Sequence, residues 1–199
     1  MTLVFVESAE GKIKKTSLEA VSYGYAMGGP VTAIALGSVN EAELKAIGKY
    51  GATKVLHASD ERLNQGIAKA YAAVLTKAMQ DENAACLVLA NSSLATPVAA
   101  LVSARVGASL ATNVVELPDT SAGFVVKRSI YTGKAFSYIE LKNPKKVIVI
   151  KKSAAEVKEV GANSPVVAYP ITLSDAEFNA KIISTEKATG EVLLPEAEI

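Results

Sequence analysis

The stretch Cys86-Leu87-Val88-Leu89-Ala90-Asn91-Ser92-Ser93-Leu94-Ala95-Thr96-Pro97 decides the fold class of this chain. Its first five residues form a continuous apolar run, which is typical of a strand that helices cover on both faces in a parallel sheet. After a short polar turn, Thr96 and Pro97 predict an N-cap and a first helical position for a helix that runs to Val106 and ends at Gly107. Strand, turn and helix in this order make one unit of an α/β sheet.

Three similar units precede this one. Strands are predicted at residues 3–6, 31–36 and 54–58. The helix after the first strand is expected to begin with a capping box of Thr16 and Glu19. Its apolar face is predicted to comprise Leu18, Val21 and Tyr25. A short helix begun by Asn40 and Glu43 and a long amphipathic helix over 64–80 follow the next two strands. Four strand–helix units in series imply right-handed crossovers and a doubly wound core.

The pattern changes after Ala108. Strand-like segments follow at 109–117, 123–130, 134–141 and 146–150, and the loops between them are too short for helices. At least some of these strands must therefore pair antiparallel. A helix over 154–160 and strands at 166–171 and Lys181 to Thr185 complete the prediction. The expected fold is α/β with three layers: a mostly parallel sheet flanked by helices, with additional antiparallel strands in the C-terminal part.

Composition narrows the possible functions. Hydrophobic residues make up 50% and charged residues 21% of the chain, which excludes intrinsic disorder. The net charge of +1 provides no overall field for nucleic acid or an anionic membrane, so we expect no nucleic-acid partner. The apolar runs are far shorter than the about 20 residues of a membrane span, so no membrane insertion is expected. The single cysteine and the absence of a basic N-terminal leader favour a cytoplasmic location.

The sequence offers few candidates for chemistry. His57, the only histidine, lies between Leu56 and Ala58 at a strand end without a companion ligand, so a structural role is favoured over a general base or a metal ligand. Cys86 lies within a buried strand, where a thiol is usually inert. Glycine-rich phosphate loops and the Gly-x-Ser-x-Gly elbow are missing. We therefore predict no catalytic residue, no cofactor-binding residue and no metal site in this chain.

Two regions remain as candidate sites. The turn Asn91 to Thr96 lies at the carboxyl edge of the predicted sheet, where it either holds a phosphate at a helix N-terminus or is an ordinary capped turn. We favour the capped turn. Residues 127–152 carry a net charge of +7 and residues 153–199 carry −5. The basic strands are either a docking face or sheet edges that lysines protect, and the second interpretation is favoured.

Several segments resemble one known family. They are Leu3 to Glu7, Gly11 to Ala20, Gly48 to Val55, Ala104 to Ala108 and Arg128 to Ala135. Their order and spacing over nearly all of the chain resemble the N-terminal domain of electron transfer flavoprotein alpha subunits. The resemblance implies an adenine nucleotide alpha hydrolase-like fold over residues 1–188. Residues 189–199 resemble the start of a linker to a FAD-binding domain that is missing from this chain.

The resemblance also implies a function. The whole protein is expected to be an electron carrier rather than an enzyme, with FAD on the missing domain and none in this chain. It would pair with a beta subunit and carry electrons from flavin dehydrogenases to a quinone reductase or another acceptor. This chain would then act as a scaffold and heterodimer contact, and Arg128, Tyr131 and Lys134 are its predicted contact residues, because tight turns expose their side chains.

Two alternatives stay open. One is a stand-alone adenine-nucleotide-binding module of the universal stress protein kind, although the segment Asn91 to Pro97 lacks the glycine cluster of such proteins. In the same segment the chain also differs from the flavoprotein family, because it has Ala95-Thr96-Pro97 where that family commonly has Gly-Arg-Asp. The other alternative is a small α/β enzyme, which would need a cleft with perturbed titratable groups.

Overall fold

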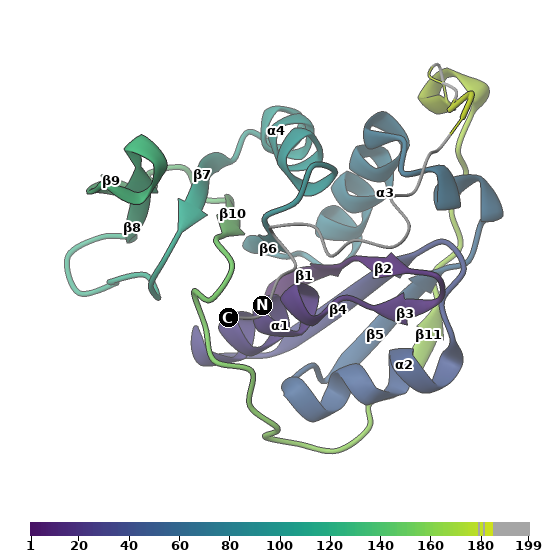
Figure 1. Cartoon of the computed structure of the whole chain (residues 1–199), viewed down its shortest axis with the longest axis horizontal. Coiled ribbons are helices and arrows are strands. Elements are labelled where there is room, and N and C mark those ends of the chain that lie inside the picture. Colours follow the sequence, from purple (N-terminus) through teal and green to yellow (C-terminus); the bar gives the residue numbers. More distant parts are fainter. Residues whose placement is uncertain (179, 181, 185–199) are drawn as a thin grey trace, which may run out of the picture.

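The computed structural model describes residues 1–178, 180 and 182–184. Figure 1 shows a central sheet with helices on both faces, which confirms the predicted α/β fold. The strands are β1 (Thr2–Val6), β2 (Ser8–Ala9), β3 (Lys12–Ile13), β4 (Val31–Leu36), β5 (Lys54–Ala58), β6 (Cys86–Ala90), β7 (Ser109–Val114), β8 (Val125–Ile130), β9 (Ala135–Glu140), β10 (Lys146–Ile150) and β11 (Val166–Ala168). The α-helices are α1 (Lys15–Ala26), α2 (Glu41–Ala46), α3 (Ala68–Asp81) and α4 (Ala95–Val106), and the 3₁₀ turns are η1 (Ile47–Tyr50), η2 (Glu61–Gln65), η3 (Tyr131–Gly133) and η4 (Asp175–Phe178).

The main sheet has nine strands in the order β11-β5-β4-β1-β6-β10-β7-β8-β9. Neighbours from β11 through β7 are parallel, whereas β8 pairs antiparallel with both β7 and β9. The predicted mixture of a parallel core and later antiparallel strands is therefore confirmed. β10 enters between β6 and β7, so that Ile148 pairs with Val88 on one side and with Ala111 on the other.

Alternating side chains of the parallel strands fill two separate cores. In β6, Leu87 and Leu89 pack with the helices α3 and α4. Cys86 and Val88 point to the opposite face, which α1 and α2 cover. Because both faces of β6 are covered, both sets of side chains are apolar, and this explains the continuous run that the sequence shows.

Helix α1 buries a different face from the predicted one. Val21 is buried as expected, but Tyr25 is 48% exposed and Tyr23 is fully buried instead. Gly24 lies against β1, where a Cβ atom at this position would be 2.9 Å from Cγ2 of Val4. The missing side chain lets the helix approach the sheet closely at Gly24, and this contact turns Tyr25 outward.

The helix starts also differ from the predictions. No side chain caps α1, because its N-cap position is Lys14 and Thr16 lies within the helix. Glu19, the predicted capping partner of Thr16, instead accepts a hydrogen bond from the backbone N–H of Ser153 at 2.8 Å. Asn40 does precede α2, but its side chain makes no capping bond. The long amphipathic helix was predicted over 64–80, yet α3 spans 68–81 because Gly66, at φ +64°, separates it from η2.

Residues 151–165 lead from β10 back to the opposite edge of the sheet. The predicted helix over 154–160 is wrong, since this segment contains no helix. The backbone N–H groups of Val160 and Gly161 donate to the carbonyl of Lys49 at 2.7 and 3.1 Å, so part of the segment is bonded to η1 rather than to itself. An extended chain can span the distance to β11, which pairs with β5 as part of the predicted strand at 166–171.

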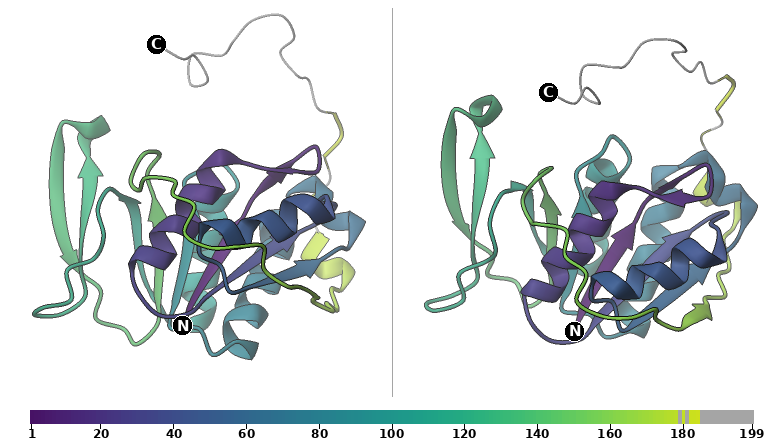
Figure 2. Two further views of the ribbon diagram at one scale, coloured as in Figure 1. Left: turned by 90° about the horizontal axis from the view of Figure 1, so that it is seen from below. Right: turned by 60° about the horizontal axis from the view of Figure 1, so that its bottom comes forward.

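The hairpin of β8 and β9 projects from one end of the molecule, as the two views of Figure 2 show. Val126 of β8 is buried against Val114 of β7, which ties the hairpin to the main body. A hydrogen bond of 2.9 Å from the Tyr23 hydroxyl to the Glu116 carbonyl adds a second link. The predicted strand from Lys181 to Thr185 lies partly outside the described residues, and its residues 182–184 form no strand. The predicted linker at 189–199 lies wholly outside them.

Candidate functional site

The carboxyl edge of the parallel sheet holds the first candidate site. The strand order reverses at β1, between β4 and β6, and this is where open α/β sheets bind ligands. Glu7 follows β1 and is anchored from several sides. Its carboxylate forms an ion pair with Lys14, and its Oε2 accepts a hydrogen bond of 2.6 Å from the Ser92 hydroxyl after β6. A negative charge therefore lies at the point where a phosphate would bind.

The turn from Asn91 to Thr96 is internally hydrogen-bonded. The Ser92 hydroxyl accepts a hydrogen bond of 2.8 Å from the backbone N–H of Ala95, the first residue of α4. The Thr96 hydroxyl bonds to the side-chain oxygen of Asn91 at 3.0 Å and to the carbonyl of Ser92 at 3.1 Å. The predicted N-cap at Thr96 is thus wrong, because Ser92 binds an N–H of the first turn. The geometry supports a capped turn at this edge.

A cavity of about 580 Å³ lies at the carboxyl ends of β4 and β5. Its walls come from the loop between β2 and β3, from the ends of β4 and β5, and from Tyr71 of α3. His57 lines it, but its Nε2 is 2.8 Å from the Gly37 carbonyl and so carries the proton of that hydrogen bond. Within the described residues, no group of three or more potential metal ligands is found. His57 thus contacts the backbone at the end of the neighbouring strand β4.

The buried nucleophiles near the sheet are poorly suited to chemistry. Burial raises the pKa of the Cys86 thiol to about 12. Burial and, to a smaller extent, the charge of Glu7 raise the pKa of Tyr71 to about 12. The Tyr71 hydroxyl also donates to the Leu63 carbonyl at 2.7 Å. Both side chains are protonated at neutral pH, and neither is activated by a neighbouring base.

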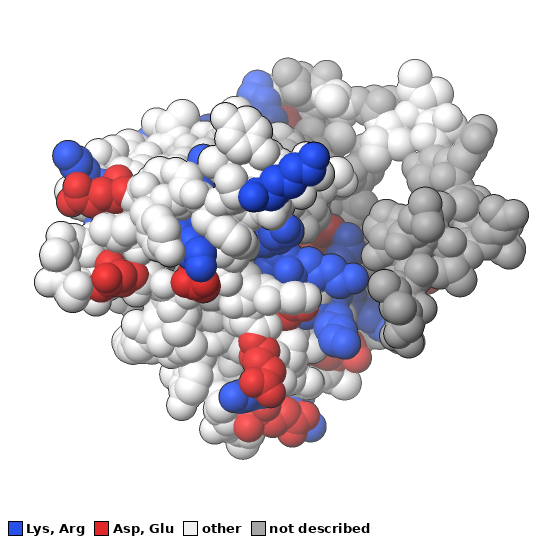
Figure 3. Space-filling model, turned by 60° about the vertical axis from the view of Figure 1, so that its left-hand side comes forward, with Lys and Arg blue, Asp and Glu red and all other residues white. Residues whose placement is uncertain are grey.

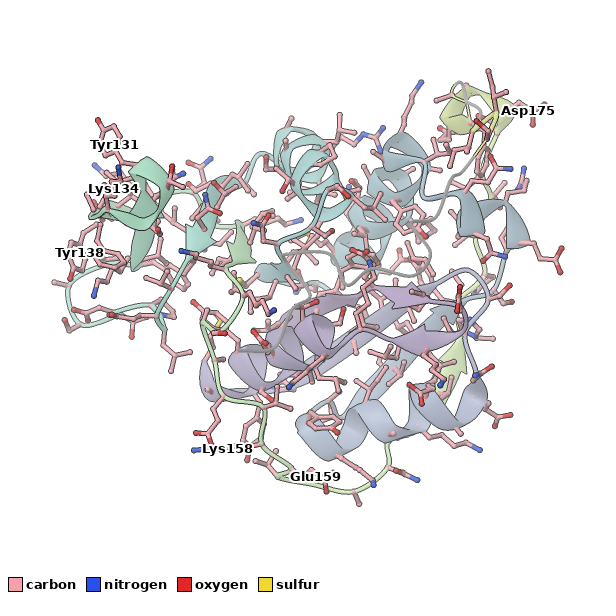
Figure 4. The ribbon with its side chains drawn as sticks, in the orientation of Figure 1. Tyr131, Lys134, Tyr138, Lys158, Glu159 and Asp175 are labelled. Carbon is pink, nitrogen blue, oxygen red and sulfur yellow. The ribbon has the colours of Figure 1, made fainter. Side chains whose placement is uncertain are left out.

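The second candidate site is the turn between β8 and β9. Tyr131 is 77% exposed, and the backbone N–H of Lys134 donates to the carbonyl of Tyr131 at 3.1 Å. Figure 4 shows both side chains at the end of the hairpin, pointing away from the body of the molecule. Arg128 lies differently, because its Nη2 turns toward β7 and donates to the Thr112 hydroxyl at 3.0 Å. Of the three predicted contact residues, the structure therefore brings only Tyr131 and Lys134 together at the tip.

Two aromatic residues of β9 that were not predicted as contact residues extend this surface. Phe136 is 53% exposed and Tyr138 is 67% exposed. The ammonium group of Lys127 lies 4.7 Å from the ring centre of Phe136 and 5.9 Å from that of Tyr138. The sequence pattern that could have predicted them is strand alternation, because Phe136 and Tyr138 are two residues apart and so share one face of the strand. We call Tyr131, Lys134, Phe136 and Tyr138 the hairpin surface.

Comparison with known proteins gives a consistent result. A family model described as the electron transfer flavoprotein domain matches residues 2–174. The electron transfer flavoprotein subunit alpha of Bacillus subtilis (strain 168) is 24% identical over 201 residues, which cover 99% of this chain and 62% of that protein. The subunit of the same name from Syntrophomonas wolfei is 25% identical over 176 residues, which cover 88% of this chain and 56% of that protein.

A yeast relative adds a third match. The probable mitochondrial electron transfer flavoprotein subunit alpha of Saccharomyces cerevisiae is 27% identical over 158 residues, which cover 77% of this chain and 45% of that protein. The chain thus spans between 45% and 62% of the length of these three relatives. Within the described residues, no helix combines the length and the apolar character that a membrane span requires.

Proposed function

This chain belongs to the electron transfer flavoprotein domain family, and we propose that it is the scaffold and heterodimer-contact domain of an alpha subunit of that family. The proposed partner is a beta subunit, which the hairpin surface contacts. In the whole protein, electrons pass from flavin dehydrogenases to a quinone reductase or another acceptor. The expected cytoplasmic location and the domain limits at 188 and 189 stay predictions.

The described residues do not fit FAD at the edge where an α/β sheet would hold its pyrophosphate. The Glu7 carboxylate lies beside the start of α4, and the turn that precedes this helix contains no glycine to let phosphate approach the backbone. We therefore propose that FAD binds outside this part of the protein. No step of electron transfer is assigned to the residues of this chain.

One observation carries the proposed contact role: β9 is the outermost strand at its end of the sheet and exposes two aromatic side chains beside Tyr131. An outer strand with large exposed aromatic side chains promotes aggregation of an isolated protein, because its free edge can pair with another chain. Tyr is also among the residue types that most often dominate binding energy at interfaces. A subunit that covers this edge would prevent such aggregation, and the buried aromatic side chains would contribute to the binding free energy.

Subunit affinity tests this proposal directly. The chain, extended to the whole alpha subunit where the gene encodes one, is mixed with its cognate beta subunit in an analytical ultracentrifuge. The double variant Tyr131→Ala, Tyr138→Ala is expected to raise the dissociation constant about 30-fold or more, because truncating a hot spot costs roughly 2 kcal/mol. Melting temperatures verify that the variants fold.

The matched control lies at the other edge of the same sheet. Val167 of β11 is 44% exposed, and Val167→Ala should leave the subunit affinity within about twofold of the parent, since a contact outside an interface contributes nothing to it. If the subunit affinity of the double variant is unchanged, the hairpin surface does not contact the beta subunit and the proposal is wrong. Equal losses in both variants would point to a general loss of folding.

The cavity of about 580 Å³ keeps the alternative of an adenine-nucleotide-binding module open to test. We expect ATP and AMP to bind weakly or not at all, because the turn Asn91 to Thr96 lacks the glycines that let backbone N–H groups approach a phosphate. Calorimetric titration of the chain with each nucleotide decides the matter. Micromolar affinity would revive the alternative and argue against a purely structural role.

A further inference from the structure

A second pocket, of about 410 Å³, opens where β8 turns into β9. Arg128 and Ser129 of β8 line one side, residues 131–133 of η3 line another, and Lys151, directly after β10, closes it from the main body. None of its described lining residues is an aspartate or a glutamate. The pocket therefore combines two cationic side chains without an acidic one.

The guanidinium of Arg128 is only partly satisfied. Its Nη2 donates to the Thr112 hydroxyl at 3.0 Å, but its Nε is buried and has no hydrogen-bond partner in the described part of the chain. Buried N–H groups of charged side chains are almost always paired, because an unpaired one loses its hydration without compensation. An unpaired guanidinium N–H in a residue that lines a pocket can donate a hydrogen bond to a ligand that carries acceptor oxygens.

Lys151 brings a second donor to the same pocket. Its Nζ lies 3.5 Å from the Ser129 hydroxyl, at the limit of a hydrogen bond. Gly133, at φ +91°, lies close to this ammonium group, since a Cβ atom there would be 3.5 Å from the Lys151 Nζ. Within residues 1–178, 180 and 182–184, neither Arg128 nor Lys151 forms an ion pair. Lys127 on the same hairpin does, with Glu116.

The surroundings add positive charge. Residues 127–152 hold eight basic side chains and one acidic one. Figure 3, which brings the hairpin side of the molecule forward, shows basic side chains gathered across the middle of this face. The acidic side chains lie more scattered in the same view. An anion that approaches this face meets a favourable field before it reaches the pocket.

We propose that this pocket binds a phosphate group, either as inorganic phosphate or as the phosphate end of a small ester. Arginine offers a fork of N–H donors that matches the oxygens of phosphate, lysine contributes a point charge, and the Ser129 hydroxyl adds a third kind of donor. The pocket differs in this from the start of α4, where the Glu7 carboxylate lies close to the helix N-terminus. This proposal does not depend on the beta subunit.

Titration of this chain with inorganic phosphate tests the proposal. Isothermal calorimetry at low ionic strength, with chloride at equal ionic strength as the blank, should show one saturable site with a dissociation constant on the order of 1 mM or lower. A parallel titration with glycerol phosphate compares the two sources. Tighter binding of the ester would support the site with an ester as its ligand, and equal or tighter binding of inorganic phosphate would support it with the free anion.

Single charge removals locate the site. Arg128→Gln and Lys151→Gln should each weaken phosphate binding at least tenfold, because each removes a charge-assisted hydrogen bond. Lys142→Gln is the matched control: it removes the same charge at the other end of β9, from an exposed side chain, and should change binding less than twofold.

The exposed position of Lys151 keeps the test valid even if the Arg128 variant unfolds, and a melting curve identifies that case. Absence of saturable binding by the unsubstituted chain would overturn the proposal. Binding that survives Lys151→Gln, or that falls equally in the Lys142→Gln control, would overturn it as well, since the site would then be diffuse surface charge.

Discussion

The parallel strands and the hairpin of β8 and β9 belong to one sheet but are covered differently. In β6 the residues Cys86 to Leu89 are all buried, because helices lie on both faces. In β9 the exposure alternates, with Phe136 and Tyr138 open to solvent and the residues between them partly covered. The parallel strands therefore bury most of the apolar side chains of this domain, whereas the hairpin exposes large aromatic side chains to solvent.

The polar groups at the carboxyl edge of the parallel strands and those in the hairpin pocket also differ, in how completely their hydrogen bonds are satisfied. At the carboxyl edge of the parallel strands, Glu7, Ser92 and Lys14 satisfy one another. At the hairpin, the Arg128 Nε has no acceptor in the described residues. A satisfied network holds the fold together, while an unsatisfied donor at a pocket wall is available to a ligand. The following experiments test whether stability and recognition are divided in this manner.

Truncation of a side chain within the parallel core should have the largest effect on the free energy of unfolding. Leu89 is fully buried and pairs with Phe5 in β1 and with Val149 in β10. Leu89→Ala should lower the free energy of unfolding by about 2–5 kcal/mol through lost burial and a residual cavity. Urea unfolding followed by circular dichroism measures it. A loss under 1 kcal/mol would contradict the assignment of this strand to the centre of the core.

Alkaline pH should cause the second-largest loss of stability, because it ionises the Cys86 thiol in the core. Burial raises the pKa of Cys86 from 9.0 to about 12, so the unfolded chain releases this proton at a lower pH than the folded chain does. The stabilising contribution is complete below pH 9 and is lost as the pH rises toward 12. Between pH 8 and 11 the Cys86→Ala variant should lose about 2–3 kcal/mol less of its free energy of unfolding than the parent chain. Equal losses in the two proteins would contradict the burial of the thiol.

The capped turn after β6 should give a smaller effect. Ser92→Ala removes the acceptor for the Ala95 N–H and the donor to Glu7, which should cost about 1 kcal/mol. Thr96→Ala is the control and should cost less than about 0.5 kcal/mol, since its hydroxyl bonds are exposed and not part of a cap. A larger loss for Thr96→Ala would restore the cap that the sequence predicted.

The hairpin surface should contribute least to stability. Phe136 is 53% exposed, so Phe136→Ala should change the free energy of unfolding by no more than about 0.5 kcal/mol. The same urea titration used for Leu89→Ala measures it. A loss comparable to that of Leu89→Ala would erase the distinction between the two regions and make the hairpin a second core.

Much of the fold could be predicted from local patterns. The apolar runs and turn residues located β1, β4, β5, β6 and β10 within one residue, whereas the predicted strands at 109–117 and 166–171 run three residues beyond the ends of β7 and β11. Gly107 ends α4 in a left-handed conformation, at the position where the helix was expected to end. Helix faces and caps were predicted less well. Glu19 and Ser92 bond to partners 134 and 85 residues away in the sequence, at Ser153 and Glu7, and no local pattern contains that information.

The candidate sites show the same limit. The exposure of Tyr131 and Lys134 followed from their place in a tight turn, and the exposed face of β9 was readable in the alternation of Phe136 and Tyr138. The inward turn of Arg128 was not readable, because it depends on Thr112 in a neighbouring strand. Lys151 reaches the same pocket only because β10 lies next to β7.

The sequence by itself determined most of the strands and helices of the first 150 residues and that the early strands are parallel, since hydrophobic period and connection length are properties of neighbouring residues. Only the tertiary structure decided that β10 enters between β6 and β7, that Tyr23 rather than Tyr25 is buried, and that Arg128 and Lys151 share a pocket. Strand order, close packing and shared pockets arise from contacts between residues far apart in the chain. Such contacts form only when the whole sheet assembles and buries its two faces.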